Sequence, residues 1–196
     1  MKLPKSWSEL TIAQYYKLIP IFEIYKDDFV ERQIKLLCLF TGKSQKEIEF
    51  MNVIQLTNTC SGLSFLSQLP ESKLQHTFSI NNNSYKAALL TSDMTAGQFI
   101  DFSHIGQNCT QDELVYHMHE LIACMCKIKK GRWYNSFWDY EGYDKTSDCF
   151  LELPMSIAYP YYVFFCNVLK NLQLPILDYS QNKIEKEMKK VKKMLK

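Results

Sequence analysis

The chain has 196 residues, the length of one domain with at most a short appendage. Hydrophobic residues make up 46% of it and charged residues 22%, which is the usage of a globular protein and excludes general disorder. The formal charge is +2, but residues 181–196 hold seven Lys and two Glu, which leaves −3 for residues 1–180. The basic character therefore belongs to the end of the chain and is no evidence for a nucleic-acid-binding body.

The seven cysteines lie mostly among apolar neighbours. Their odd number fits free thiols in a reducing compartment better than a disulfide framework. The first residues contain no apolar signal segment, and the longest apolar stretch, 157–169, is shorter than the ~18 residues that a membrane helix needs. We therefore expect neither secretion by a signal peptide nor a membrane-spanning segment.

Capping boxes recur along the chain, in which a Thr or Ser hydroxyl bonds an amide three residues on and a Gln or Glu reaches back. They begin at Thr11, Ser44, Thr95 and Thr110. Pro20 is expected to kink or end the first helix and Gly42 to stop the second, which Asp27 or Asp28 caps. The predicted helices cover about 12–19, 28–40, 44–51, 53–68, 95 onward, 110–129 and 156–172. The helix over 110–129 has the clearest 3.6-residue period.

Two of the boxes resemble each other beyond their caps. Thr11–Tyr16 reads TIAQYY and Thr95–Ile100 reads TAGQFI, 84 residues later. A duplicated unit would explain this, and so would the shared capping chemistry, so both explanations remain open.

In one segment the hydrophobic pattern no longer has the period of a helix. Residues 76–80 and 84–89 flank three asparagines at 81–83, and Asn tolerates the left-handed backbone angles of a tight turn. This predicts a β-hairpin near 76–90, the one strand pair that we expect. The fold class is therefore mainly α: a compact helical domain with one small β-hairpin.

The chain divides into an α-rich body over residues 1–175 and a Lys-rich C-terminal helical arm over 176–196, because Pro175 interrupts the apolar pattern. The arm helix, from about Ser180, is basic and amphipathic, with an apolar stripe at i, i+4, i+7 and i+11. The stripe consists of Ile184, Met188, Val191 and Leu195. The core is expected to include Leu36, Leu37, Leu39, Phe40, Leu121, Ile122, Met125, Phe164, Phe165 and Leu169.

Catalytic signatures are missing. No glycine pair has the spacing of a phosphate-binding loop, and no nucleophile motif is found. His117 and His119 lie two residues apart, as do Cys124 and Cys126, and residues so spaced point to different faces of a helix. A zincin-type site instead needs histidines four residues apart. We therefore expect no catalytic residue, metal, cofactor or small-molecule substrate, and no enzyme activity.

Residues 127–144 interleave basic and aromatic side chains, and Trp, Tyr and Arg are the residues that dominate protein interfaces. Rings folded back onto the core explain the pattern equally well. Nucleic-acid binding is the third and least favoured explanation of this segment, because Asp139, Glu141 and Asp144 would repel phosphates.

The C-terminal arm could bind an acidic groove, an anionic membrane or DNA, although the absence of Trp and Phe disfavours membrane insertion. The candidate partner-binding residues are Arg132, Trp133, Tyr134, Phe137, Trp138, Tyr140, Tyr143, Lys186, Lys189, Lys190 and Lys193.

Two stretches carry a further pattern, Leu3–Tyr15 (LPKSWSELTIAQY) and Met94–Asp101 (MTAGQFID). Supporting stretches are Leu37–Gly42 (LCLFTG), the 65–70 segment with the following hairpin, Leu121–Ala123, and Pro154 with Phe164-Phe165. Together they resemble morphogenesis proteins encoded among the tail genes of tailed bacteriophages. These include tail-assembly-chaperone-like proteins and virion ring or tail proteins of Bacteroides crAss-like phages. The resemblance covers about residues 3–170 and leaves out the Lys-rich arm.

The resemblance implies a non-catalytic role in the virion, which is assembled in the host bacterial cytoplasm. The first expectation is a ring, connector or tail-barrel subunit that contacts copies of itself and other tail or portal-proximal proteins, with the arm near protein or DNA. The second is a tail assembly chaperone that holds the tape-measure protein and leaves before maturation. The aromatic segment and the cationic arm suit fixed contacts and favour the first. A phage adaptor or a nucleic-acid-binding protein is a further alternative.

Overall fold

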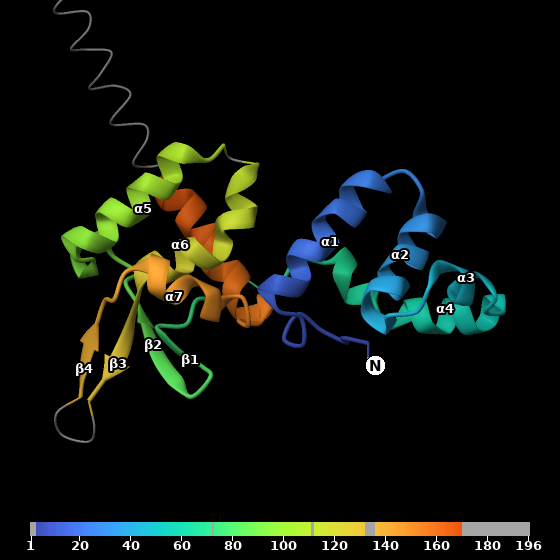
Figure 1. Ribbon diagram of the computed structural model, residues 1–196, viewed down its shortest axis with the longest axis horizontal. Helices are drawn as coiled ribbons and strands as arrows, with labels where there is room; N and C mark the ends of the chain where they lie inside the picture. Colours follow the sequence, from blue (N-terminus) through green and yellow to red (C-terminus); the bar gives the residue numbers. More distant parts are fainter. Residues whose placement is uncertain (1–2, 72, 111, 132–135, 170–196) are drawn as a thin grey trace, which may run out of the picture. The chain divides into compact units, whose positions relative to one another are not determined.

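The structure is a computed structural model that describes residues 3–71, 73–110, 112–131 and 136–169 (Figure 1). Backbone contacts divide the chain into two units, residues 1–162 and 163–196. The expected boundary between body and arm at 175/176, and the arm helix from about Ser180, lie outside the described residues.

The first seventy residues are helical. They comprise α1 (Ile12–Ile24), α2 (Phe29–Thr41), α3 (Gln45–Glu49), α4 (Val53–Ser61) and the 3-10 helix η1 (Ser64–Ser67). The capping boxes at Thr11 and Ser44 are confirmed. Asp28 caps α2 by accepting from the Glu31 amide at 2.9 Å, and Gly42 ends it with a φ of 70°, as expected.

Two of the predicted helix ends were wrong. α1 continues through Pro20 to Ile24, because the exposed proline costs one hydrogen bond while the helix still packs on α2. The single helix expected over 53–68 is instead two pieces, since Gly62 ends α4 and the chain then forms η1. This break determines the direction in which the Leu63–Ser67 segment faces.

Among the residues that the structure describes, the sheet has four antiparallel strands in the order β1-β2-β3-β4. They are β1 (Thr77–Ile80), β2 (Asn83–Ala87), β3 (Cys126–Lys130) and β4 (Phe137–Asp139). The predicted hairpin is confirmed as β1–β2, and its turn uses φ values of 48° at Asn81 and 65° at Asn82. Tyr85 faces Phe78 on one side and Ile128 on the other, so β2 joins the hairpin to the rest of the sheet.

The long helix expected over 110–129 was wrong. A 3-10 helix, η3 (Glu113–His117), precedes α6 (Met118–Met125), and the chain then enters β3. The sequence CKIKK alternates apolar and cationic residues, which suits a strand as well as a helix end. Pairing of Cys126 and Ile128 with β2 selects the strand. The loop expected over 132–148 is also partly structured, since it contains β4 and α7 (Tyr143–Phe150).

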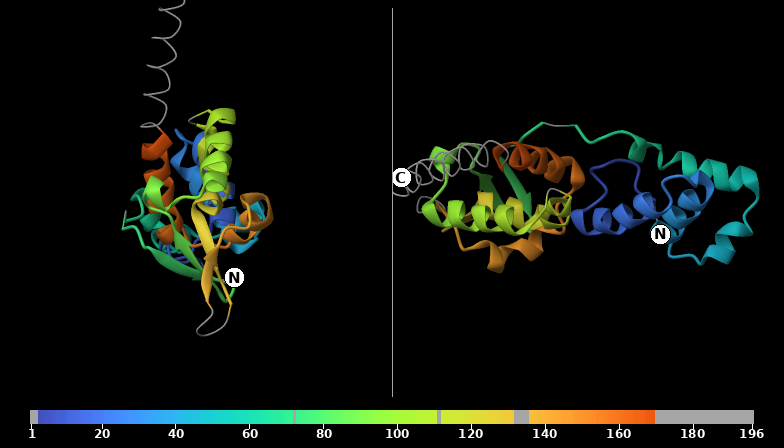
Figure 2. Two further views of the ribbon diagram at one scale, coloured as in Figure 1. Left: turned by 90° about the vertical axis from the view of Figure 1, so that its left-hand side faces the viewer. Right: turned by 90° about the horizontal axis from the view of Figure 1, so that it is seen from above.

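Further helices complete the described chain: η2 (Thr91–Asp93), α5 (Ala96–Asn108) and a helical stretch over 155–169. α6 packs against both α5 and α7. The β1–β2 turn lies at the end of the sheet away from α5 (Figures 1 and 2). The fold class is therefore mainly α with a small antiparallel sheet, which is as predicted except for the two additional strands.

The segment just before α1 is hydrogen-bonded to residues near 154, far along the chain. Thr11 forms an isolated antiparallel bridge with Pro154. The Ile12 amide donates to the Leu153 carbonyl at 3.1 Å, and the Met155 amide donates to the Leu10 carbonyl at 2.7 Å. Leu10, Ile12, Leu153 and Met155 are all fully buried, so the entry to α1 is part of the core.

Most of the expected core is confirmed. The buried members are Leu36, Leu37, Phe40, Leu121, Ile122, Met125, Phe165 and Leu169. Leu39 and Phe164 are instead half-buried. Leu39 is a member of an apolar run that continues around α2, and one face of such a helix need not be covered.

Candidate protein-interaction site

The edge strand β4 presents aromatic side chains to solvent. Phe137 is 58% exposed and Trp138 36% exposed. Trp138 pairs with Lys129 of β3, and β4 is the last strand of the sheet in the described residues. Two of the predicted partner-binding residues are thus accessible on the same strand, which agrees with an interface role for them.

The residues after β4 are anchored to the body. The Tyr140 hydroxyl donates to the Asp101 carboxylate on α5 at 2.5 Å, and Lys130 Nζ lies 2.6 Å from Glu141 Oε1. Burial, followed by the bond to Asp101, raises the pKa of Tyr140, so the ring stays protonated. Tyr143 is half-buried at the start of α7. These two tyrosines fit the alternative in which the rings fold back onto the protein.

The other predicted partner-binding residues lie outside the described part of the chain. They are Arg132, Trp133, Tyr134, Lys186, Lys189, Lys190 and Lys193.

The histidines form structural contacts with their neighbours. His119 Nδ1 lies 2.9 Å from the hydroxyl of Tyr16, which also accepts from the His119 amide at 3.3 Å. His117 Nδ1 lies 2.9 Å from Glu120 Oε2. Burial lowers the pKa of His119 despite the nearby Glu120. The His119–Tyr16 contact therefore joins α6 to α1 with a neutral imidazole.

The thiols nearest these histidines are unsuited to nucleophilic chemistry. Cys124 and Cys126 are buried, and burial raises the pKa of each thiol far above its usual value. Within the described residues, no three His, Cys, Asp or Glu side chains gather closely enough to hold a metal ion.

A second apolar surface lies on α4 and was missed by the sequence analysis. None of the nine residues of α4 is buried. Val53 and Ile54 are 76% and 73% exposed, and Phe50, just before the helix, is 89% exposed. An amphipathic helix normally buries its apolar face, so α4 has a surface that the rest of the described chain leaves uncovered.

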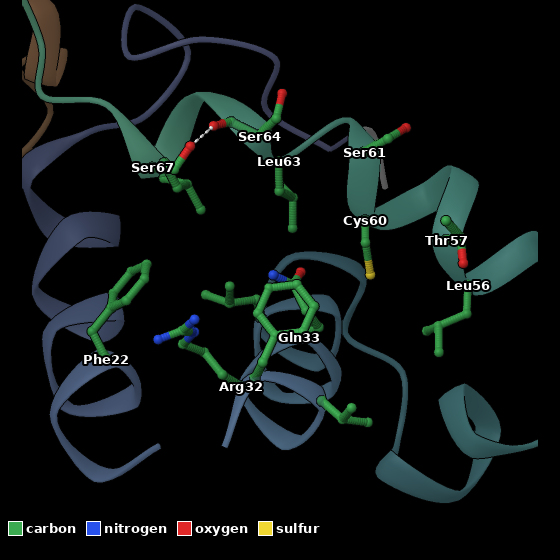
Figure 3. Close-up of a pocket in the computed structure, with 14 residues that line it drawn as sticks. Phe22, Arg32, Gln33, Leu56, Thr57, Cys60, Ser61, Leu63, Ser64 and Ser67 are labelled. Carbon is green, nitrogen blue, oxygen red and sulfur yellow. Dashed lines mark hydrogen bonds between the residues drawn. The ribbon is translucent and has the colours of Figure 1, made fainter. Parts of the chain in front are cut away.

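The other side of α4 borders a groove of about 680 Å³ (Figure 3). Its walls come from α1, α2, α4 and η1. Cys60 and Leu63 point from α4 and the segment before η1 toward Arg32 and Gln33 on α2, and Phe22 of α1 points toward Arg32. Apart from the Ser and Thr hydroxyls at its rim, the lining is largely apolar, and Arg32 is the charged residue within it.

Arg32 lies over two aromatic rings, with its guanidinium carbon 5.8 Å from the centroid of Phe22 and 5.6 Å from that of Phe29. It donates to the Lys26 carbonyl at 3.3 Å. Among the described carboxylates none forms an ion pair with it. The adjacent Glu31 instead lies 3.3 Å from Lys35 Nζ and accepts from Gln45 at 3.2 Å.

Gln33 adds a second polar group to the groove. Its Oε1 atom is buried and has no hydrogen-bond partner within the described structure. A buried acceptor without a donor costs about 1–3 kcal/mol, so a donor from a bound molecule would stabilise it.

Comparison with protein families, curated proteins and solved structures finds no match to this chain. In the described residues, no helix combines the length and apolar character that crossing a bilayer requires.

Proposed function

We propose that this chain is a non-enzymatic structural protein of a tailed-phage virion, a ring, connector or tail-barrel subunit that acts through protein–protein contacts. The observation that supports it most directly is the uncovered apolar surface of Phe50, Val53 and Ile54 at α4. The phage assignment depends on the resemblance of residues 3–15 and 94–101 to tail-gene morphogenesis proteins.

The energetics favour an assembled state. Full burial of a side chain such as Val, Ile or Phe stabilises a complex by about 1.5–3 kcal/mol. In a ring, each such contact recurs around the symmetry axis. The stabilisation from a modest apolar patch is therefore repeated at every subunit interface. The proposed partners are copies of this chain and other tail or portal-proximal proteins, with the Lys-rich arm near protein or DNA. Assembly would take place in the host bacterial cytoplasm.

The absence of catalysis is part of the proposal. Its support is that the thiols of Cys124 and Cys126 are protonated and buried, and that His119 is engaged by Tyr16. Groups held in this way serve packing rather than proton transfer or nucleophilic attack.

The groove beside α4 favours a second candidate. A tail assembly chaperone must hold an apolar helical segment of the tape-measure protein, and an open, mostly apolar groove suits that task. In this role the chain would be absent from the mature virion.

Quantitative mass spectrometry of purified mature particles separates the two candidates. A structural subunit should be present at a fixed ratio to the other tail proteins. Presence in infected cells together with absence from particles would favour the chaperone. A chain found neither in particles nor in complexes with tail proteins would overturn both.

A matched pair of variants tests the α4 surface itself. Ile54→Asp should reduce incorporation into particles, because it places a charge in the proposed contact. Gln55→Asp adds the same charge at an exposed position about a quarter-turn around α4 and serves as the control. Equal incorporation of both variants would show that the Ile54 surface is not a contact.

A further inference from the structure

We propose that the groove between α1, α2, α4 and η1 binds an amphipathic helix of a partner protein that places bulky apolar side chains in the groove and a carboxylate on Arg32. The inference depends on the part of the proposed function in which the chain acts through contacts with other polypeptides. It adds the chemistry of the partner, which that function leaves open.

The walls of the groove suit a helix. They are formed by the sides of helices, whose backbone groups are bonded internally, so a partner strand would find no free sheet edge there. The volume of about 680 Å³ accommodates several bulky side chains. Leu63 is buried, and Phe22, Leu56 and Leu66 are half-buried around it, so apolar anchors would be well surrounded.

Arg32 specifies an acidic partner. Its guanidinium lies in an apolar lining over Phe22 and Phe29, with one hydrogen bond of 3.3 Å to a carbonyl. Glu31, the neighbouring carboxylate, is held by Lys35 and Gln45. A guanidinium has five donors arranged to receive a carboxylate in two parallel bonds, and charge-assisted bonds of this kind are strong. Among the described side chains no acidic group takes that place, so the partner would supply it.

Gln33 further limits which partner helix the groove can accept. It follows Arg32 in α2, and its buried Oε1 needs a hydrogen-bond donor. A partner helix with a carboxylate for Arg32 and an amide or hydroxyl donor nearby would satisfy both groups. A purely apolar occupant, such as an acyl chain, would leave the Gln33 acceptor unpaired.

The charge of Arg32 also argues against the Lys-rich arm of a second copy. Residues 181–196 have an apolar stripe, but they carry seven Lys and two Glu. Bringing that charge to an unpaired guanidinium in an apolar site is unfavourable. A peptide copy of residues 181–196 is therefore included below as a competing occupant.

The probe is a display library of amphipathic helices of about 16 residues, with Leu fixed along one face and Glu, Gln or Lys at each flanking position. Binders selected on the full chain should be enriched in Glu at one flanking position. The resynthesised Glu peptide should bind about tenfold more tightly than its Lys counterpart in fluorescence anisotropy.

Arg32→Gln should abolish this preference, whereas Lys17→Gln, which removes a positive charge from an exposed position of α1, should preserve it. Circular dichroism melting verifies that both variants fold. Cys60 lines the groove, so the bound Glu peptide should slow its alkylation while leaving Cys109, which lies outside, unchanged. Selection of no binders, enrichment in Lys, or tighter binding of the 181–196 peptide would overturn the proposal.

The outcome is independent of the test of the proposed function. If the chain is present in mature particles but shows no Glu preference, the acidic-helix inference fails and the structural role stands. If the Glu preference is present and depends on Arg32 while the chain is absent from particles, the groove inference stands and the structural role fails.

Discussion

The fully buried amide of Gln98 donates to the main-chain carbonyl of Cys124 at 3.0 Å. The oxygen of the same side chain accepts from the Thr95 amide at 3.1 Å and so completes the capping box of α5. One side chain therefore both begins a helix and joins α5 to the end of α6. Gln14 holds the equivalent place in the box of α1, where its oxygen accepts from Thr11 at 3.0 Å.

This difference predicts unequal costs for the same substitution. Gln98→Ala should lower the free energy of unfolding by about 2–3 kcal/mol, because it leaves the Cys124 carbonyl without its donor. Gln14→Ala should cost about 0.5–1 kcal/mol, the worth of a capping interaction near the surface. Urea denaturation of the two variants checks this. Equal costs would mean that the bond to Cys124 contributes nothing.

The contact between His119 and Tyr16 predicts a loss of stability in acid. The folded pKa of His119 is lowered, mainly by burial, so below about pH 6.5 the unfolded chain binds a proton that the folded chain resists. The contribution is present above that pH and falls as the pH decreases. His119→Gln should therefore show a smaller drop in urea midpoint between pH 7.5 and 5.5 than the unsubstituted protein. His104→Gln, at an exposed position of α5, should keep the full drop.

The buried thiols predict a selective pattern of alkylation. In the native protein at pH 8, iodoacetamide should leave Cys124 and Cys126 unmodified while the half-buried thiols react slowly. Denaturation in urea should expose all seven. Peptide mass spectrometry distinguishes the sites. Rapid native labelling of Cys124 would contradict the packing described here and would reopen nucleophilic chemistry.

The aromatic strand β4 predicts a functional loss without a folding loss. Phe137→Ala should change the unfolding free energy by no more than about 0.5 kcal/mol, because its ring is 58% exposed. Trp138→Ala should cost about 1 kcal/mol, because that ring is only 36% exposed. On the proposal that the chain is a virion subunit, the double variant should nevertheless enter mature particles less efficiently. Phe150→Ala is the contrasting control, since that ring is fully buried and its loss should cost about 3–5 kcal/mol. Undiminished incorporation of the double variant would remove β4 from the interface.

Features encoded by neighbouring residues could be predicted from the sequence. The caps at Thr11, Ser44 and Thr95 depend on side chains three residues apart, and the turn at Asn81 and Asn82 depends on the tolerance of Asn for positive φ. β3 could not be predicted in this way. Its residues continue an apolar helical period, and only pairing with β2, some forty residues earlier in the chain, selects a strand.

The candidate site shows the same limit. The aromatic content of 137–143 was visible in the sequence, but which rings face solvent depends on the bond from Tyr140 to Asp101 on α5. The groove depends on the break at Gly62, which turns Leu63 toward α2. A helix continuous to residue 68, as the pattern indicated, would have placed these side chains differently.

The backbone hydrogen bonds between Leu10–Ile12 and Leu153–Met155 have a consequence for synthesis on the ribosome. The start of the first helix lacks its bonding partners until about residue 156 has left the exit tunnel. A nascent chain that stalls earlier exposes Leu10 and Ile12, which are fully buried in the finished protein, to proteases and chaperones. Quality control of this part of the chain would therefore operate only after about residue 156 has emerged, rather than helix by helix.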